Sequence, residues 1–159
     1  MSSSGKSKTT TPKIKSASVV VVRTEWNATI VNRLFAGCKK ILDAEKVDLR
    51  DFIVPGAFEI PFAINNIWEQ SKKNKPDAFI ALGCVIKGDT PHFEFVCRAV
   101  TDGIRSLNLE LPVPVIFGIL TVDNQEQAEE RTGGIHGHKG EEAAATALKM
   151  ISFSRSIQR

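Results

Sequence analysis

Short apolar runs alternate with amphipathic segments along most of the chain. Residues 17–22 are a β-branched run that is too short for a helix, and residues 49–54 and 78–86 are similar apolar runs. A fourth run covers residues 111–120. Continuous runs of this length are typical of strands that are buried on both faces of a parallel sheet. The pattern therefore predicts four strands, each followed by a helical segment.

Between these runs, apolar residues recur at spacings of three and four, which predicts amphipathic helices. Asn27 is placed to cap the first helix, and Pro61 fits only near the first turn of the second. A capping-box pattern that starts at Asp123 opens a short helix, which Gly133-Gly134 would stop. The predicted helices cover residues 28–45, residues 59–73, a segment from Phe93 to Leu107, a short segment within 123–134, and residues 140–153.

Strand-helix alternation predicts parallel strands joined by right-handed crossovers, with helices on both faces of the sheet. We therefore expect one α/β domain over residues 17–159, a three-layer α/β/α sandwich of flavodoxin-like type with about four parallel strands. Residues 1–16 are polar and predict a flexible tail. A transit peptide is the alternative for this Ser/Thr/Lys-rich, acid-poor segment.

Composition and charge are those of a globular protein and do not indicate a nucleic-acid-binding or membrane protein. The chain is 42% hydrophobic and 25% charged, which is ordinary for a globular protein. Four lysines in residues 5–15 supply much of the formal net charge of +3, so the remainder is close to neutral and nucleic-acid binding is not indicated. No apolar run approaches the roughly 18 residues of a membrane span, and the N-terminus lacks a hydrophobic secretory signal. Cys38, Cys84 and Cys97 show no paired spacing, which indicates reduced, buried thiols in a cytoplasmic protein.

Ligands of parallel sheets of this kind bind outside the carboxyl ends of the strands. The segments that meet this condition are residues 23–27, 54–59, 87–92 and 120–123. Within the first of them, Trp26 suits stacking on a planar ring, and packing against the next helix is the alternative. We expect the residues that bind ligands or react to lie at this edge of the sheet.

The turn Lys-Gly-Asp-Thr-Pro-His at residues 87–92 carries two candidate functions. With Pro91 in the first helical position, Thr90 would cap the helix, and free backbone amides would face an anion such as a phosphate. Asp89 opposes an anion unless its carboxylate points away. The positive helix end disfavours an imidazolium at His92, so this side chain suits proton transfer. Taken alone, a plain capped helix with a packed or surface histidine explains the same residues.

Arg131 and Lys139 flank a glycine-rich segment, TGGIHGHKG, that contains His136 and His138. Arg131 near a helix end is ordinarily a favourable charge on the helix dipole. The two histidines lack a third ligand at metal spacing, so a zinc site is not indicated. Glu142 suits the first turn of the last helix.

Four ordered blocks resemble the lumazine synthase family of riboflavin biosynthesis. They are VPGAFEIP at 54–61, GCVIKGDTPHFEFV at 83–96, PVIFGILTVDNQEQAEERTGG at 114–134 and HKGEEAA at 138–144, and the similarity extends over about residues 17–153. The resemblance implies the condensation of 5-amino-6-(D-ribitylamino)uracil with 3,4-dihydroxy-2-butanone 4-phosphate. The implied products are 6,7-dimethyl-8-ribityllumazine, phosphate and water, and the reaction requires no metal and no cofactor.

The same resemblance implies roles for individual residues. His92 corresponds to the general acid/base, and the main chain of Asp89 and Thr90 corresponds to phosphate contacts, with the Asp89 side chain facing outward. Arg131 is expected to grip the phosphate from the adjacent subunit, and Trp26 to stack on the pyrimidine ring. The other residues implied to line the pyrimidine and ribityl pocket are Asn27, Gly56, Ala57, Phe58, Glu59, Val85, Ile86 and Lys87. Those implied to reach in from the adjacent subunit are Phe117, Lys139 and Glu142.

A site shared between subunits implies assembly. The resemblance implies a homopentamer, and the short form of the segment TGGIHGHKG favours a 60-subunit icosahedral shell over a free pentamer. The expected partners are small-molecule substrates, further copies of the chain and riboflavin synthase, with no nucleic acid and no membrane. A family paralogue that mainly binds riboflavin or builds a shell is the alternative to an enzyme. A flavodoxin is disfavoured because RTEWN at 23–27 is no phosphate loop.

Overall fold

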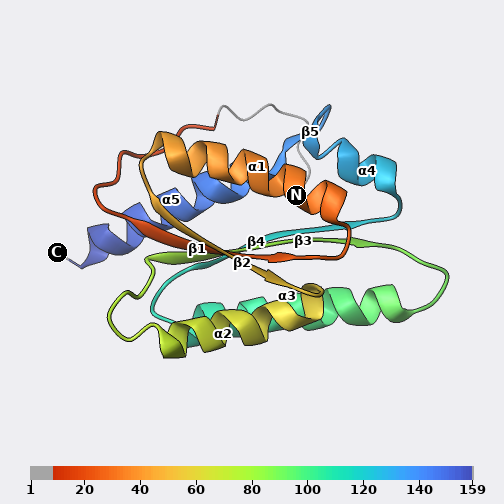
Figure 1. Cartoon of the computed structure of the whole chain (residues 1–159), viewed down its shortest axis with the longest axis horizontal. Helices are drawn as coiled ribbons and strands as arrows, with labels where there is room; N and C mark the ends of the chain where they lie inside the picture. Colours follow the sequence, from red (N-terminus) through yellow and green to blue (C-terminus); the bar gives the residue numbers. More distant parts are fainter. Residues whose placement is uncertain (1–8, 159) are drawn as a thin grey trace.

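The computed structural model describes residues 9–158, in which four parallel strands form one sheet with helices on both faces (Figure 1). The strand order is β2-β1-β3-β4. The strands are β1 (Ser18–Thr24), β2 (Asp48–Val54), β3 (Ala78–Ile86) and β4 (Val115–Val122). β1 pairs in parallel with both β2 and β3, so that Val22 lies opposite Phe52 on one side and Ala81 on the other. The predicted flavodoxin-like α/β/α sandwich is confirmed.

Helices α1 and α5 cover one face of the sheet, and α2 and α3 cover the other (Figure 1). The short helix α4 lies beyond the end of β4, and a single 3₁₀ turn, η1, precedes α2. The helical bounds are α1 (Ala28–Ala44), η1 (Ala57–Glu59), α2 (Ile60–Gln70), α3 (His92–Glu110), α4 (Gln125–Glu129) and α5 (Lys139–Ile157).

Each of the central strands contributes to two separate hydrophobic cores. In β1, Val19 and Val21 face α1 and α5, whereas Val20 and Val22 face α2 and α3. All four side chains are fully buried. Burial of one such side chain contributes roughly 1.5–3 kcal/mol relative to leaving it exposed. The continuous apolar runs of the sequence therefore arise because both faces of the sheet are covered.

The predicted bounds of the fourth strand and of the second helix differ from the observed ones. The fourth strand begins at Val115 and not at residue 111, because Pro112 and Pro114 have no N–H with which to continue a sheet ladder. The carbonyl oxygen of Pro114 accepts a hydrogen bond from the Phe79 N–H at 2.9 Å, and this bond starts the pairing with β3. The second helix ends at Gln70, three residues before the predicted end.

The caps of two later helices also differ from prediction. Helix α3 begins at His92 with Pro91 in the cap position, and no side chain makes a cap hydrogen bond, so Thr90 does not cap it. Helix α4 is capped by Asn124, whose side-chain oxygen accepts from the Gln127 N–H at 2.9 Å, and not by Asp123.

Two short strands after α4 were not predicted. Strand β5 (Thr132–Gly134) pairs antiparallel with β6 (Gly137–His138), where the sequence pattern predicted only a glycine stop. Gly133 has a φ of 113°, a conformation that favours glycine. This ladder leads directly into α5, whose observed start at Lys139 is one residue before the predicted start.

The segment before β1 contacts the helical layer. Within residues 9–16, the hydroxyl of Thr11 donates to the Glu45 carboxylate at 2.7 Å, and the Arg155 guanidinium donates to the Lys15 carbonyl oxygen at 2.7 Å. The first eight residues of the predicted flexible tail, and residue 159, lie outside the described residues. In the described part of the chain, no helix is both long and apolar enough to cross a membrane.

Replacement of Gly140 by alanine tests the close docking of α5 on α1. A Cβ at Gly140 would overlap the main-chain carbonyl of Leu34 in α1, and backbone cannot move aside as a flexible side chain can. We expect Gly140→Ala to lower the free energy of unfolding by about 3 kcal/mol. The matched control is Gly88→Ala, because no atom lies within 4 Å of a Cβ there. Urea unfolding at equal protomer concentration measures both, and equal midpoints would contradict this packing.

Candidate active site

Backbone hydrogen bonds continue between the segments that follow β1 and β2. The Glu25 N–H donates to the Val54 carbonyl oxygen at 2.8 Å, and the Trp26 N–H donates to the Pro55 carbonyl oxygen at 3.1 Å. The Trp26 indole lies beside Gly56, where a Cβ would come within 2.9 Å of the ring. Although 65% of its surface is exposed, Trp26 is therefore held in place by its backbone hydrogen bond and by the packing of its ring against Gly56.

Asn27 joins the end of β1 to the end of β3. Its backbone is left-handed, with φ 58° and ψ 39°, and its side-chain nitrogen donates to the carbonyl oxygen of Cys84 at 2.7 Å. Asn27 occupies the predicted cap position of α1, but its side chain makes no cap hydrogen bond, so the predicted capping interaction is wrong. The buried hydroxyl of Thr24 donates to the Trp26 carbonyl oxygen at 3.1 Å. These two bonds fix the segment that carries the indole.

Residues 56–59 form a tight turn at the end of β2. The Gly56 N–H donates to the Glu59 carboxylate at 3.0 Å, which closes the turn on itself. Ala57 is buried in the core shared with α2 and α3, whereas Phe58 is 64% exposed. The turn therefore presents the exposed Phe58 side chain, whereas Gly56, the residue beside Trp26, is buried.

The end of β3 leads into the start of α3. Val85 and Ile86 are half-buried, and the backbone N–H of Lys87 donates to the carbonyl oxygen of Val122 at 2.9 Å. All residues from Lys87 to His92 are exposed. No side chain caps α3, and the Glu94 N–H donates to the Pro91 carbonyl oxygen at 3.0 Å. The amides of His92 and Phe93 are the ones left for an anion at the positive end of the helix.

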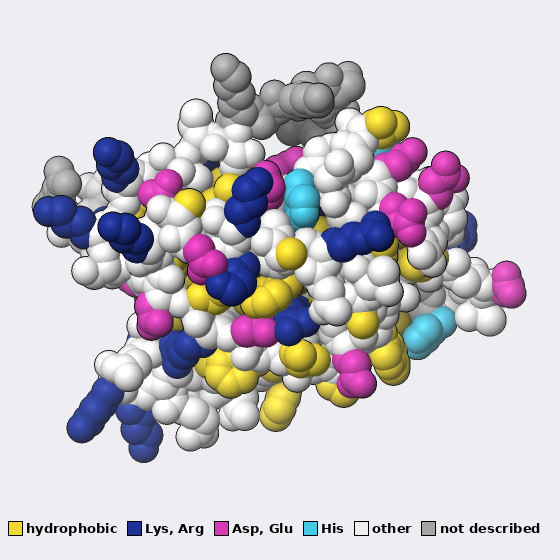
Figure 2. Space-filling view, turned by 45° about the horizontal axis from the view of Figure 1, so that its top comes forward, with side chains coloured by type: hydrophobic (Ala, Val, Ile, Leu, Met, Phe, Trp, Pro, Cys, Tyr) yellow, Lys and Arg dark blue, Asp and Glu magenta, His cyan; other side chains and the backbone are white. Residues whose placement is uncertain are grey.

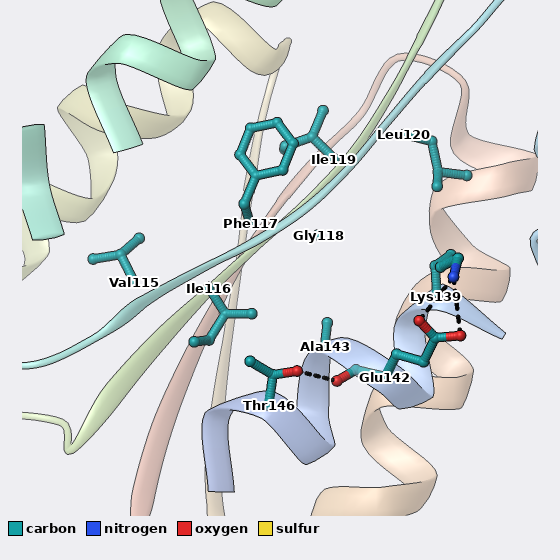
Figure 3. Close-up of a pocket in the computed structure, with 10 residues that line it drawn as sticks. All are labelled: Val115, Ile116, Phe117, Gly118, Ile119, Leu120, Lys139, Glu142, Ala143 and Thr146. Atoms are coloured by element: carbon teal, nitrogen blue, oxygen red, sulfur yellow. Dashed lines mark hydrogen bonds and ion pairs between the residues drawn. The ribbon is translucent and has the colours of Figure 1, made fainter. Parts of the chain in front are cut away.

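A second set of predicted residues lies elsewhere, along the outer edge of β4. A groove there is lined by β4 and by the first turns of α5, and it contains Phe117, Lys139 and Glu142 (Figure 3). The Lys139 ammonium pairs with the Glu142 carboxylate at 2.8 Å. Neither Trp26 nor His92 lines this groove. One chain therefore divides the predicted residues between two places.

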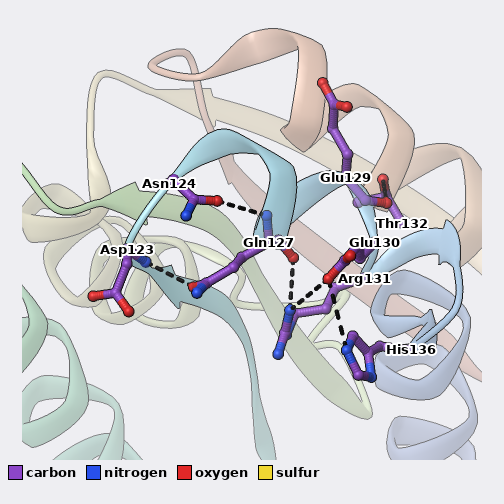
Figure 4. Close-up of polar contacts among 8 residues, drawn as sticks. All are labelled: Asp123, Asn124, Gln127, Glu129, Glu130, Arg131, Thr132 and His136. Carbon is purple, nitrogen blue, oxygen red and sulfur yellow. Dashed lines mark hydrogen bonds and ion pairs between the residues drawn. The ribbon is translucent and has the colours of Figure 1, made fainter.

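Arg131 follows α4 and does not line the groove beside β4. Its side chain lies among residues of α4 and of the segment after it (Figure 4). Its Nη1 donates to the carbonyl oxygen of Gln127 at 2.8 Å and lies 3.9 Å from the Glu130 carboxylate. Its carbonyl oxygen accepts from the Lys139 N–H at 2.8 Å, so the two cationic residues are linked through the backbone. Within residues 9–158, Nη2 makes no hydrogen bond, which leaves that edge of the guanidinium able to bind an anion.

The cysteines are unsuited to nucleophilic catalysis. Burial raises the pKa of Cys38 to about 12, with the nearby Asp51 carboxylate adding to the effect, and burial raises the pKa of Cys84 to about 11. Burial also raises the pKa of Cys97. The thiolate is the reactive form, and it is scarce in all three at neutral pH. Among the described residues, no group of three His, Cys, Asp or Glu side chains is arranged to hold a metal ion.

Two supporting residues were missed by the sequence analysis. Thr24 is a polar residue at the end of an apolar strand, a position that signals a side-chain bond to the backbone of the following turn. Gln127 stands three residues after Asn124, the spacing of a reciprocal cap, and its side-chain oxygen accepts from the Asp123 N–H at 2.9 Å. The bond from Asn27 to Cys84 joins distant segments and has no local signal.

Comparisons of the sequence with known proteins show the family to which the chain belongs. The family model described as 6,7-dimethyl-8-ribityllumazine synthase matches residues 16–155. A protein of that name from Parabacteroides distasonis is 43% identical over 146 residues, which cover 90% of this chain and 89% of the relative. Relatives of the same name from Bacteroides fragilis and Porphyromonas gingivalis are 46% and 48% identical, over 87% and 82% of this chain and 97% and 81% of their own lengths.

Substitution of Asn27 tests the bridge between β1 and β3. Asn27→Ala removes the bond to Cys84 and disfavours the left-handed backbone, so we expect a loss of about 2–3 kcal/mol in the free energy of unfolding. Asn27→Gly removes the same bond but accepts the backbone conformation, and we expect about half that loss. Chemical unfolding followed by tryptophan fluorescence measures both variants. A larger loss in the glycine variant than in the alanine variant would contradict the assigned backbone strain.

Proposed function

The chain belongs to the 6,7-dimethyl-8-ribityllumazine synthase family, and from this premise we propose which of its residues bind the substrates and which transfer protons. The protein is a transferase of riboflavin biosynthesis that joins 5-amino-6-(D-ribitylamino)uracil to 3,4-dihydroxy-2-butanone 4-phosphate. The alternative of a paralogue that mainly binds riboflavin or builds a shell is not favoured by relatives that all carry the name of the enzyme.

The observation that supports our assignment is the division of the predicted residues into separate sets. Trp26, the turn at 56–59 and His92 lie at the carboxyl edge of the sheet, whereas Lys139 and Glu142 lie in the groove beside β4. A single protomer therefore offers two incomplete halves. Each active site is formed where the carboxyl edge of one protomer meets the groove and Arg131 of its neighbour.

The phosphate of the butanone is bound at the start of α3. The backbone amides around Asp89 and Thr90 point to the anion, and the exposed Asp89 carboxylate turns to solvent. The guanidinium of Arg131 from the neighbouring protomer completes the site with a charge-assisted contact through its free edge. Both groups stabilise the phosphate as it leaves, when its negative charge is greatest.

The uracil ring stacks on Trp26, whose exposed indole offers a large flat face. Asn27 and the turn from Gly56 to Glu59 line the ribityl chain and the ring, with Phe58 beside them. Val85, Ile86 and Lys87 flank the ring edge. Phe117, Lys139 and Glu142 of the neighbour close the pocket, where the Lys139 ammonium can donate to a ring carbonyl.

Proton transfer is the remaining chemical requirement. The substrate amine attacks the ketone to form an imine with loss of water, and a proton leaves the adjacent carbon as phosphate departs. The enol that remains takes up a proton at its terminal carbon and becomes a ketone. The second amine attacks this ketone to close the ring, and a further dehydration gives the product. His92, exposed in the first turn of α3 beside the phosphate amides, accepts and returns these protons. None of these steps needs a thiolate, in agreement with the raised pKa values of Cys38 and Cys84.

Assembly into a homopentamer, and of pentamers into a 60-subunit icosahedral shell, is part of the proposal. The outer edge of β4 is unpaired within the described sheet, and hydrophobic side chains gather along the lower margin of the face in Figure 2. Phe62 and Phe95 are 75% and 71% exposed. Apolar side chains on this scale indicate surfaces that another copy covers. We place the assembly in the cytoplasm, with riboflavin synthase, the consumer of the lumazine, as its protein partner.

Arg131→Ala and His92→Ala distinguish anion binding from proton transfer. We expect Arg131→Ala to lower turnover by an amount equivalent to roughly 2–5 kcal/mol, because a charged contact to the leaving phosphate is lost. We expect His92→Ala to lower turnover only about tenfold, because the diamine is already nucleophilic and positioning contributes much of the rate. Lumazine formation is followed optically, together with phosphate release, after mixing both substrates. Wild-type rates in Arg131→Ala would refute its role.

Sedimentation velocity tests the proposed assembly. We expect the purified protein to sediment as a shell of about 60 subunits, with pentamers as the dissociation product. A stable pentamer with full turnover would contradict the shell but keep the shared site. A fully active monomer would contradict the shared site itself.

A further inference from the structure

His138 has no role in the proposed function, yet it caps the helix that carries Lys139 and Glu142. Its Nδ1 accepts a hydrogen bond from the backbone N–H of Glu141 at 3.4 Å, the cap of α5. An acceptor role requires that Nδ1 carries no proton. The imidazole thereby satisfies one of the amides that a helix start leaves without a partner.

Three elements hold the imidazole in this position. A Cβ on Gly37 of α1 would overlap the ring, so the glycine provides the space in which the ring lies. From β5, a Cβ on Gly133 would lie 3.7 Å from Cδ2 of the same ring. The backbone of His138 pairs with Thr132 in the β5–β6 ladder. The side chain is therefore fixed between α1, β5 and α5.

Lys139, the residue after His138, is bonded through its backbone to Arg131, the other cation of the proposed site. The Lys139 N–H donates to the Arg131 carbonyl oxygen at 2.8 Å, directly beside the cap. The pair of Lys40 with Glu141 also links α1 and α5 at this point, at 3.0 Å, and its Lys40 side chain is 72% exposed. An exposed pair of this kind contributes little. The cap, the packing of the ring and the close docking of Gly140 on Leu34 therefore set the local geometry.

We propose that His138 is a positioning residue, which caps α5 through Nδ1 and thereby holds Lys139 and Arg131 in the geometry that binds substrate across the subunit boundary. The inference rests on the proposed function, because it takes those two cations as substrate-binding residues. It adds a residue that touches no substrate and acts through the backbone at the start of α5.

The test compares His138→Asn with His138→Leu. Asparagine is a strong helix cap and keeps an oxygen acceptor close to the position of Nδ1, whereas leucine keeps bulk and loses the acceptor. We expect His138→Leu to exchange the Glu141 amide hydrogen about tenfold faster than wild type and to raise KM for the butanone phosphate about tenfold. We expect His138→Asn to stay within about threefold of wild type in both measurements. Lys40→Ala serves as the control for the surface pair, with no change expected in either.

A substitution in α1 tests the same packing of the His138 ring. Gly37→Ala places a methyl group where the imidazole lies, so we expect the defects of His138→Leu in an otherwise unchanged chain. In the His138→Asn background, the smaller side chain leaves room for that methyl group, and we expect Gly37→Ala to add less than twofold.

Each outcome decides one claim. Equal defects in His138→Asn and His138→Leu would overturn the cap, and faster amide exchange in His138→Leu with unchanged KM would overturn the positioning role. A failure of the proposed function is recognised separately, because Arg131→Ala would then keep wild-type turnover while the exchange measurement at Glu141 would still report the cap.

Discussion

Parallel pairing of β1 with both β2 and β3 is the constraint on which the rest of the structure depends. Parallel strands require crossover connections, so the segments that follow β1, β2 and β3 all leave from the same edge of the sheet. Helices that begin there direct their free amides and their positive dipole ends toward that edge. The strand ends thus bring Trp26, the turn at 56–59 and the start of α3 to the same edge, although residues 26 and 92 are far apart in the chain.

In the proposed function, the fourth strand is the reason that the site depends on assembly. β4 has no second neighbour within the described sheet, and its outer edge carries the groove with Lys139 and Glu142. Neither Trp26 nor His92 lines this groove, so in the proposed function one chain does not complete the pocket by itself. The exposed aromatic side chains support the proposed assembly, because apolar surface on this scale is typical of interaction sites. In the proposed function, a shared site would link catalysis to assembly, since a protomer without neighbours would lack the guanidinium that we assign to the phosphate.

The strands and long helices were predictable because their signals are local and strong. β-branched runs and periodic apolar faces depend on residues that are close in sequence, and β3 was predicted at its observed bounds. Smaller features were missed where a distant partner decided the outcome. Asn27 reads as a cap, but its side chain binds Cys84, 57 residues away. The β5–β6 ladder has strands of three and two residues, too short for any periodic signal. The site residues were predicted from four sequence blocks, because no local pattern identifies a pyrimidine.

Complementation between defective protomers tests the shared site most directly. Co-expression of Arg131→Ala and His92→Ala chains in equal amounts produces mixed assemblies in which each site draws its histidine and its guanidinium from different protomers. Random mixing leaves roughly a quarter of such sites intact, so turnover should rise several-fold above the mean of the two parent variants. If each chain formed its own complete site, every site would keep one defect. Turnover that equals the mean of the parents in verified mixed assemblies would contradict the account.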